Sequence, residues 1–130
     1  MMLLFALACE RDPNAPPVVN YDLDACVDCG MLVSDPAYSS AIVTKDGKTL
    51  PFDDPACLFH YMVAKGPEVR GLWFHDGAAD QWLRENEVGF VPGSNSPMGS
   101  GLKPAPVGTP GAVSVGEASS RVLSGPVVSK

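Results

Sequence analysis

The chain has 130 residues, and its fifteen acidic and nine basic side chains give a net charge of −6. This length suits one domain with its own core, and the 13 glycines and 13 prolines predict short elements joined by many turns. The acidic balance, without a basic cluster, excludes nucleic acid as an expected partner because phosphate groups would be repelled.

The N-terminus combines an apolar stretch with a cysteine. Residues 1–8 form a signal-like segment, and Ala8-Cys9 resembles the lipid-attachment site of bacterial lipoproteins. We therefore expect Cys9 to carry lipid and residues 9–23, which include three prolines, to form a flexible tether. The alternative is a short apolar terminus without a targeting role.

No later stretch approaches the ~20 apolar residues of a membrane span. The sequence therefore predicts a protein on the exported side of the cell envelope, at its periplasmic face. Its contact with the membrane would be through the lipid anchor only.

Two thiols and a thioether occur close together in the run Cys26-Val27-Asp28-Cys29-Gly30-Met31. Sulfur ligands favour soft ions such as Cu(I) over Mg(II) or Ca(II), whereas Zn(II) would compete through the two cysteines. Gly30 allows a turn with positive φ that would fold Met31 back toward the thiols. The other interpretations of this run are a structural knuckle or a redox pair, with Met31 as an ordinary core residue.

Two hairpin strands and a helix are predicted next. Strands over 40–45 and 48–52 flank Asp46-Gly47, a strong hairpin signal. Asp54 as N-cap, Pro55 at the first helical position and Gly66 after the last turn predict a helix over 56–64. An extended run over 69–74 follows.

Cys57 falls near the start of this predicted helix, and His60 lies on the same helix face. Helix N-terminal amides lower the pKa of a thiol, so Cys57 is a candidate reactive or metal-bound thiolate. The simpler interpretation is that Cys57 is a small buried hydrophobe and His60 a surface ring. If Cys9 carries lipid, however, three cysteines remain, and an unpaired thiol in an oxidising compartment requires a reason such as metal binding or a redox cycle.

The second half predicts a similar order of elements. We expect a short bridging helix over 78–84, strands over 88–91 and 102–107, a helix opened by Ser114 and ending at Leu123, and a last strand over 126–129. The predicted class is therefore α+β, with two small strand-strand-helix-strand units at about 38–75 and 87–130, in which antiparallel sheets pack on helices.

A glycine- and serine-rich loop over 95–101 carries Met98. Constrained by its glycines and Pro97, this loop presents a thioether that packing does not readily explain. Met98 is thus either a side chain resting on the sheet or a ligand that completes a site with Cys29 and Met31. We find no Ser/His/Asp arrangement and no phosphate-binding glycine loop in the sequence, and we expect no enzymatic activity.

These elements together resemble the NosL family, the copper-binding accessory lipoproteins of nitrous-oxide reductase maturation. The resemblance extends from about Asp24 to Val128 and corresponds to a copper-binding domain over 24–130. The residues that carry it are Ala8-Cys9, Cys29-Gly30-Met31, Phe52-Asp53 before a helix, Val91-Pro92-Gly93-Ser94 leading into Pro97-Met98-Gly99, and a final small-residue helix followed by a Gly and Val strand.

The resemblance implies that Cys29, Met31 and Met98 are Cu(I) ligands. Cys26 is additional to the family signature, and the histidine that relatives carry a few residues later is missing from Ser34-Asp35-Pro36. A second thiolate would then replace a nitrogen ligand. The implied partner is a copper-enzyme maturation complex or an apo-copper enzyme, and we expect a monomer.

The leading hypothesis is accordingly a membrane-tethered Cu(I) metallochaperone that supplies a copper-enzyme maturation system, for example that of nitrous-oxide reductase. A second is a thiol-disulfide oxidoreductase that uses Cys26 and Cys29. A third is a structural zinc site formed by Cys26, Cys29, Cys57 and His60.

Overall fold

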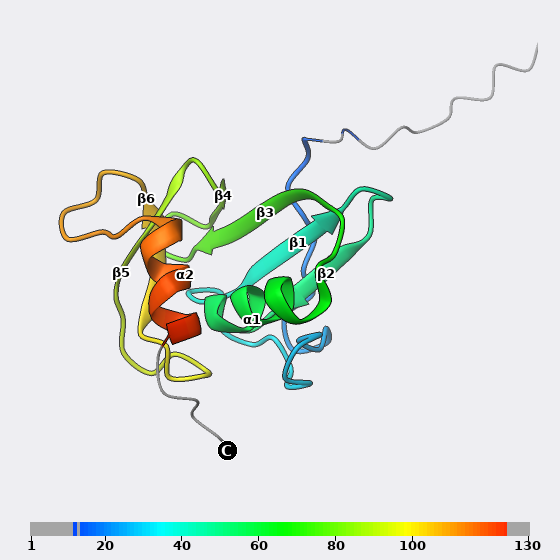
Figure 1. Ribbon diagram of the computed structural model, residues 1–130, viewed down its shortest axis with the longest axis horizontal. Helices are drawn as coiled ribbons and strands as arrows, with labels where there is room; N and C mark the ends of the chain where they lie inside the picture. The colour runs from blue at the N-terminus through cyan, green and yellow to red at the C-terminus, as the bar shows by residue number, and fades with distance from the viewer. Residues whose placement is uncertain (1–11, 13, 125–130) are drawn as a thin grey trace, which may run out of the picture.

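The computed structural model describes residue 12 and residues 14–124 of the chain. Within these ranges the fold is α+β, as the sequence predicts, with two antiparallel sheets and two helices (Figure 1). One sheet has the order β2-β1-β3-β4, and the other pairs β5 with β6. The elements are β1 (Ser40–Thr44), β2 (Thr49–Phe52), α1 (Pro55–Lys65), β3 (Val69–Asp76), β4 (Gln81–Arg84), β5 (Val88–Pro92), β6 (Leu102–Pro106) and α2 (Val115–Ser124).

The hairpin β1–β2 turns at the predicted glycine, and Gly47 has a φ of +86°. Its register pairs Ser40 with Phe52 and Val43 with Thr49. Because successive strand residues point to opposite faces, one face of the sheet carries the buried side chains of Ile42 and Phe74. Helix α1 covers this face (Figure 1).

An aromatic cluster joins the second sheet to the first. The Phe90 ring of β5 meets the Phe74 ring of β3 edge-on, at 5.1 Å between centroids and 90° between planes. Phe59 of α1 packs on both rings, at 5.9 and 6.1 Å between centroids. The two sheets and both helices therefore share one hydrophobic core.

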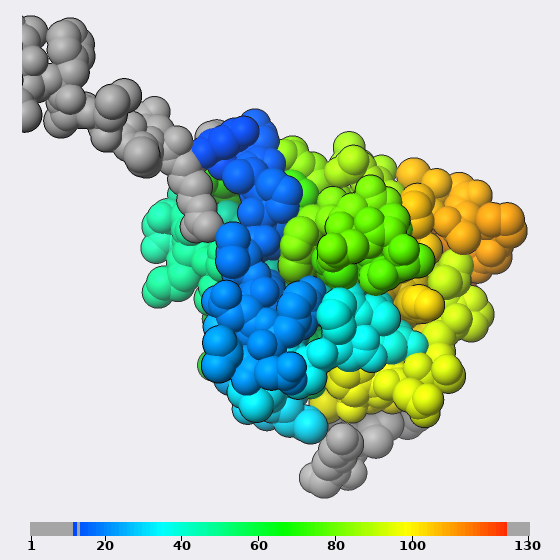
Figure 2. Space-filling view, turned by 180° about the vertical axis from the view of Figure 1, so that it is seen from behind, coloured from blue at the N-terminus to red at the C-terminus, as the bar shows by residue number. Residues whose placement is uncertain are grey.

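The segment that precedes β1 lies over the molecule on the side shown in Figure 2. Pro17 is buried there, and the carbonyl oxygen of Asn14 accepts a hydrogen bond from Arg84 Nη2 at 3.0 Å. The Tyr21 and Ser39 hydroxyls also meet at 2.7 Å. This segment, which the sequence predicts to be a tether, thus contacts the domain from Asn14 onward.

The helix predicted over 78–84 is wrong. Asp80 has a φ of +47° at the end of a turn, and Gln81–Arg84 continues as strand β4. Pairing with β3 places Trp82 opposite His75, with the two rings 5.0 Å apart, and Leu83 opposite Phe74 in the core. Burial of alternate residues against a neighbouring strand thus overrides the local helix pattern.

The second predicted unit is described as β5, β6 and α2. Its expected last strand at 126–129 lies outside the described residues, as do the signal-like residues 1–8 and Cys9. Among the described helices, neither is long and apolar enough to cross a membrane.

Candidate metal site

Three cysteines and a carboxylate meet at one point of the fold. A ligand atom of each of Cys26, Cys29, Asp53 and Cys57 lies within 4.8 Å of the corresponding atom of every other. The residues come from two separate parts of the chain, namely the loop over 25–32 and the junction between β2 and α1. The arrangement is a candidate metal site with three thiols and one oxygen donor.

The loop is closed by its own backbone. The Cys26 amide donates to the Met31 carbonyl at 2.7 Å, and the Gly30 amide donates to the Cys26 carbonyl at 2.9 Å. Gly30 has the positive φ, +81°, that the sequence predicts. One further bond, from the Val27 amide to the Pro51 carbonyl at 3.1 Å, joins the loop to β2. As a result, Cys26 is buried, whereas Cys29 at the rim is partly exposed.

The other half of the cluster depends on how α1 begins. Asp54 is the N-cap, as predicted, and its Oδ1 accepts from the Ala56 amide at 2.9 Å. Pro55 follows at the first helical position, so Cys57 lies in the first turn and is fully buried. Asp53 precedes the cap, and the extended backbone of Asp54 sends the two successive carboxylates to different sides.

Asp53 is a buried carboxylate, 1% exposed, that faces thiols. Its oxygens accept from Cys29 Sγ at 3.5 and 3.6 Å and from Cys57 Sγ at 3.4 Å. Within the described part of the chain, we find no lysine, arginine or histidine that forms an ion pair with it. A buried anion is costly unless a cation or strong donors compensate it, so a bound metal ion would supply the missing positive charge.

The three thiols differ in acidity. When the single Cys57 proton points to Cys26 instead of Asp53, it lowers the pKa of Cys26 to about 6, assisted by backbone amides such as that of Cys29 at 3.5 Å. Burial raises the pKa of Cys29 to about 11. The same hydrogen bond to Cys26, together with burial, raises the pKa of Cys57. The cluster thus favours the thiolate of Cys26 over those of Cys29 and Cys57, and thiol ligands release their protons when a metal binds.

The two expected thioether ligands occupy different positions. Met31 is 51% exposed beside the cysteine loop. Met98 is partly buried against the core, and its amide donates to Asp54 Oδ2 at 3.0 Å. Met98 also lines a cavity of about 770 Å³ together with Ala56 and His60 of α1. Both methionines therefore lie on segments that adjoin the two halves of the cluster.

The histidines lie outside the four-residue cluster. His60 is half exposed, and its Nδ1 lies 3.9 Å from Asp28 Oδ2 at the edge of the loop. His75 is buried, with Nδ1 2.5 Å from the Pro36 carbonyl and Nε2 3.0 Å from Asp80 Oδ1. His75 thus has a structural role.

Two members of the cluster have simpler interpretations in the sequence. Cys57 fits a small buried hydrophobe, and the pair Asp53-Asp54 fits a helix cap. The structure shows that Asp54 alone is the cap, and that Cys57 is buried as one wall of the cluster. The available signal was conditional: if Cys9 carries lipid, an odd number of thiols remains, and Cys57 then requires a partner.

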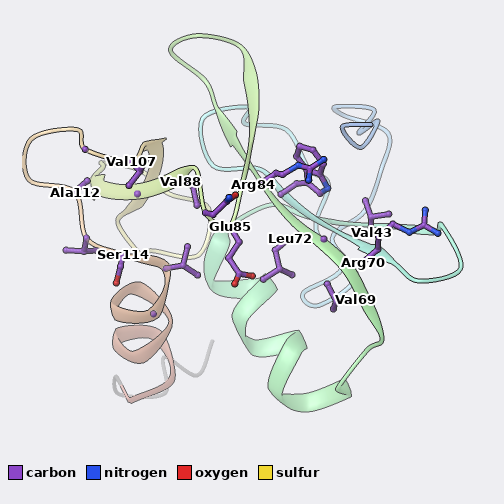
Figure 3. A pocket seen from close by; sticks show the side chains of 18 of the residues that line it. Val43, Val69, Arg70, Leu72, Arg84, Glu85, Val88, Val107, Ala112 and Ser114 are labelled. Carbon is purple, nitrogen blue, oxygen red and sulfur yellow. The ribbon is translucent and has the colours of Figure 1, made fainter. Parts of the chain in front are cut away.

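A second groove, of about 870 Å³, lies apart from the cluster (Figure 3). Its walls include Leu72, Val88 and Glu85, and Arg84 lies over the Trp73 ring at 4.9 Å from the centroid. Among the described residues, no cysteine, histidine or methionine lines this groove.

No family model matches this chain, and neither the curated proteins nor the solved structures contain a match to it.

Proposed function

We propose that this protein is a membrane-tethered Cu(I)-binding metallochaperone that delivers copper to a copper-enzyme maturation system. The observation that carries the proposal is the convergence of Cys26, Cys29 and Cys57 within 4.8 Å. Thiolates are soft ligands that select Cu(I), and three of them suit its low coordination number. The resemblance to the NosL family supports the same ion.

The exposure of the sulfur atoms supports transfer rather than permanent storage. Cys26 and Cys57 are buried, whereas Cys29 is partly exposed and Met31 is mostly exposed at the surface beside it. A thioether carries no proton and binds more weakly than a thiolate, so it can exchange with the ligand of a partner. In this proposal Cys26, Cys29 and Cys57 hold the ion, Met98 adds a weaker sulfur ligand, and the exposed Met31 assists exchange with a partner.

The proposal also includes the location of the protein, its partner and its oligomeric state. Cys9 would carry the lipid, at the periplasmic face of the envelope, and the partner would be a maturation complex or an apo-copper enzyme, for example nitrous-oxide reductase. The protein would act as a monomer and would make or break no substrate bond.

The test is a competitive Cu(I) titration of the reduced protein, combined with X-ray absorption to count sulfur neighbours. We expect about one Cu(I) per chain, and weaker binding in both Cys29→Ser and Met98→Ala. Met62→Ala is the matched control, because Met62 is also partly buried against the core but lies on α1 beyond the first turn. Unchanged Cu(I) affinity in both Cys29→Ser and Met98→Ala would refute the proposal.

One observation favours a second candidate, a structural Zn(II) site. Zn(II) accepts three thiolates and one oxygen in a tetrahedral site, and Asp53 provides that oxygen where His60 was expected. This candidate predicts that chelators unfold the protein and that Asp53→Asn weakens Zn(II) binding. It also predicts that Met31→Ala and Met98→Ala have no effect.

The pair of Cys26 and Cys29 gives less support to a thiol-disulfide oxidoreductase than to a metal-binding function. The residues after Cys29 form a turn and an isolated bridge between Ala25 and Leu32, so no helix begins at the pair. Metal-free protein is therefore expected to show no turnover in a disulfide reductase assay.

A further inference from the structure

Asp54 is a fully buried carboxylate, 0% exposed, that takes no part in the cysteine cluster. It makes three hydrogen bonds. Oδ1 accepts from the Ala56 amide at 2.9 Å and from the Ser100 hydroxyl at 2.6 Å, and Oδ2 accepts from the Met98 amide at 3.0 Å. Capping α1 needs only the first of these bonds, so the other two require a separate explanation.

The two extra bonds come from the loop that carries Met98. This loop is internally fixed, because the Gly99 amide donates to the Ser96 carbonyl at 3.0 Å and the Gly101 amide donates to Ser96 Oγ at 2.9 Å. Holding Met98 and Ser100 at one carboxylate therefore fixes the position of the whole loop. The Asp54 carboxylate therefore joins this loop to the start of α1.

The position of Asp54 in the chain connects the loop to the metal site. Asp53, the preceding residue, contributes its carboxylate to the cluster, and Cys57 lies one helical turn later. A displacement of the loop relative to Asp54 would thus be a displacement of Met98 relative to the thiols.

We propose that Asp54 is a positioning residue that fixes the Met98 loop against the start of α1, and through this loop positions the Met98 thioether that we propose as a Cu(I) ligand. The proposal rests on the function proposed above. Residues that orient metal ligands without binding the metal themselves typically raise metal affinity about 10- to 100-fold. A substitution of Asp54 should change Cu(I) affinity only because it displaces Met98.

The test compares Asp54→Ser with Met98→Ala in the full chain, by competitive Cu(I) titration and X-ray absorption. Serine remains a good N-cap but is too short to reach the loop, so α1 is expected to keep its start. We expect Asp54→Ser to weaken Cu(I) binding by about the same factor as Met98→Ala and to lose one sulfur neighbour. The double variant should be no weaker than Met98→Ala alone.

Asp54→Asn provides a second, milder variant. Asparagine caps helices as well as aspartate does, and its oxygen can still accept from Ala56 and Ser100, but its amide group cannot accept from the Met98 N–H. It should lose part of the affinity, with little change in the unfolding of the metal-free protein. Ser100→Ala, which leaves the Met98 bond in place, should have a smaller effect than Asp54→Ser.

Two outcomes would overturn the inference. One is wild-type affinity and sulfur count in Asp54→Ser. The other is a further loss of affinity when Asp54→Ser is added to Met98→Ala, because Asp54 would then act through another residue. If Cys29→Ser and Met98→Ala themselves keep wild-type affinity, it is the proposed function that fails.

Discussion

Replacing Asp53 by asparagine should stabilise the metal-free protein and reduce the stabilisation that a bound metal adds. The carboxylate is 1% exposed, and its donors are thiols at 3.4 to 3.6 Å, which are weak partners for a buried charge. Asparagine keeps the shape and an acceptor oxygen but removes the charge. We expect the free energy of unfolding of the metal-free protein to rise by about 1–2 kcal/mol, which raises Tm by about 3–6 °C in a domain of this size.

The stabilisation that metal binding adds should decrease. A ligand at a thousandfold excess over its Kd stabilises the native state by about 4 kcal/mol, and each tenfold loss of affinity removes about 1.4 kcal/mol of that gain. Without the carboxylate the cluster attracts a cation less strongly, so the rise of Tm on adding metal should be smaller in Asp53→Asn than in the wild type.

Calorimetry of the reduced protein, with and without metal, measures both changes. Asp22→Asn is the matched control, because Asp22 is exposed and has a φ of +64°, which asparagine tolerates. It removes the same charge without touching the cluster and should leave both values unchanged. A metal-free Asp53→Asn protein that is less stable than the wild type, with an undiminished metal effect, would refute the reasoning and make Asp53 a purely structural residue.

Four further predictions concern the thiols and the core. Cys57→Ser should weaken Cu(I) binding about tenfold or more in a competitive titration, whereas wild-type affinity would remove Cys57 from the site. In metal-free protein, the thiolate absorbance of Cys26 should appear with a midpoint near pH 6, and Cys57→Ala, which removes the donor, should raise that midpoint; a midpoint near pH 9 in the wild type would contradict the hydrogen bond between them. Because the pKa of Cys26 is lower in the folded protein, its contribution to stability is complete above pH 9 and is lost as the pH falls toward 6, which urea unfolding as a function of pH measures. Phe90→Ala should cost about 3–5 kcal/mol in urea unfolding, since its ring joins the two sheets, and a loss under 1 kcal/mol would contradict a single core.

Local chemistry made much of the fold predictable. Gly47 after Asp46 sets the hairpin turn, and Asp54-Pro55 at one end and Gly66 at the other set the bounds of α1. By contrast, the choice of strand over helix at Gln81–Arg84 depends on the partner strand β3, which no local window contains. A sequence pattern identifies such a segment as ordered but does not decide its pairing.

The same division applies to the site. Cys26 and Cys29 are close in sequence, so their proximity follows from a short loop alone. Cys57 and Asp53 join them only because the loop docks on the start of α1, through long-range contacts that spacing does not specify. Packing likewise decides which of the two successive carboxylates caps the helix and which one turns toward the sulfur atoms.

The two halves of the site are not attached equally firmly to the rest of the fold. Cys57 and Asp53 lie at the start of a helix that packs on the shared core, whereas the turn with Cys26 and Cys29 is joined to β2 by the Val27 amide. Opening this turn would break few contacts compared with global unfolding, so it belongs to the motions that occur within the native state. Amide hydrogen exchange would register it as fast exchange over residues 26–31, next to protected amides in α1. Release of a copper ion held between these two halves would then depend on how readily the loop opens as well as on ligand exchange, and loop opening can change without any change in the ligands themselves.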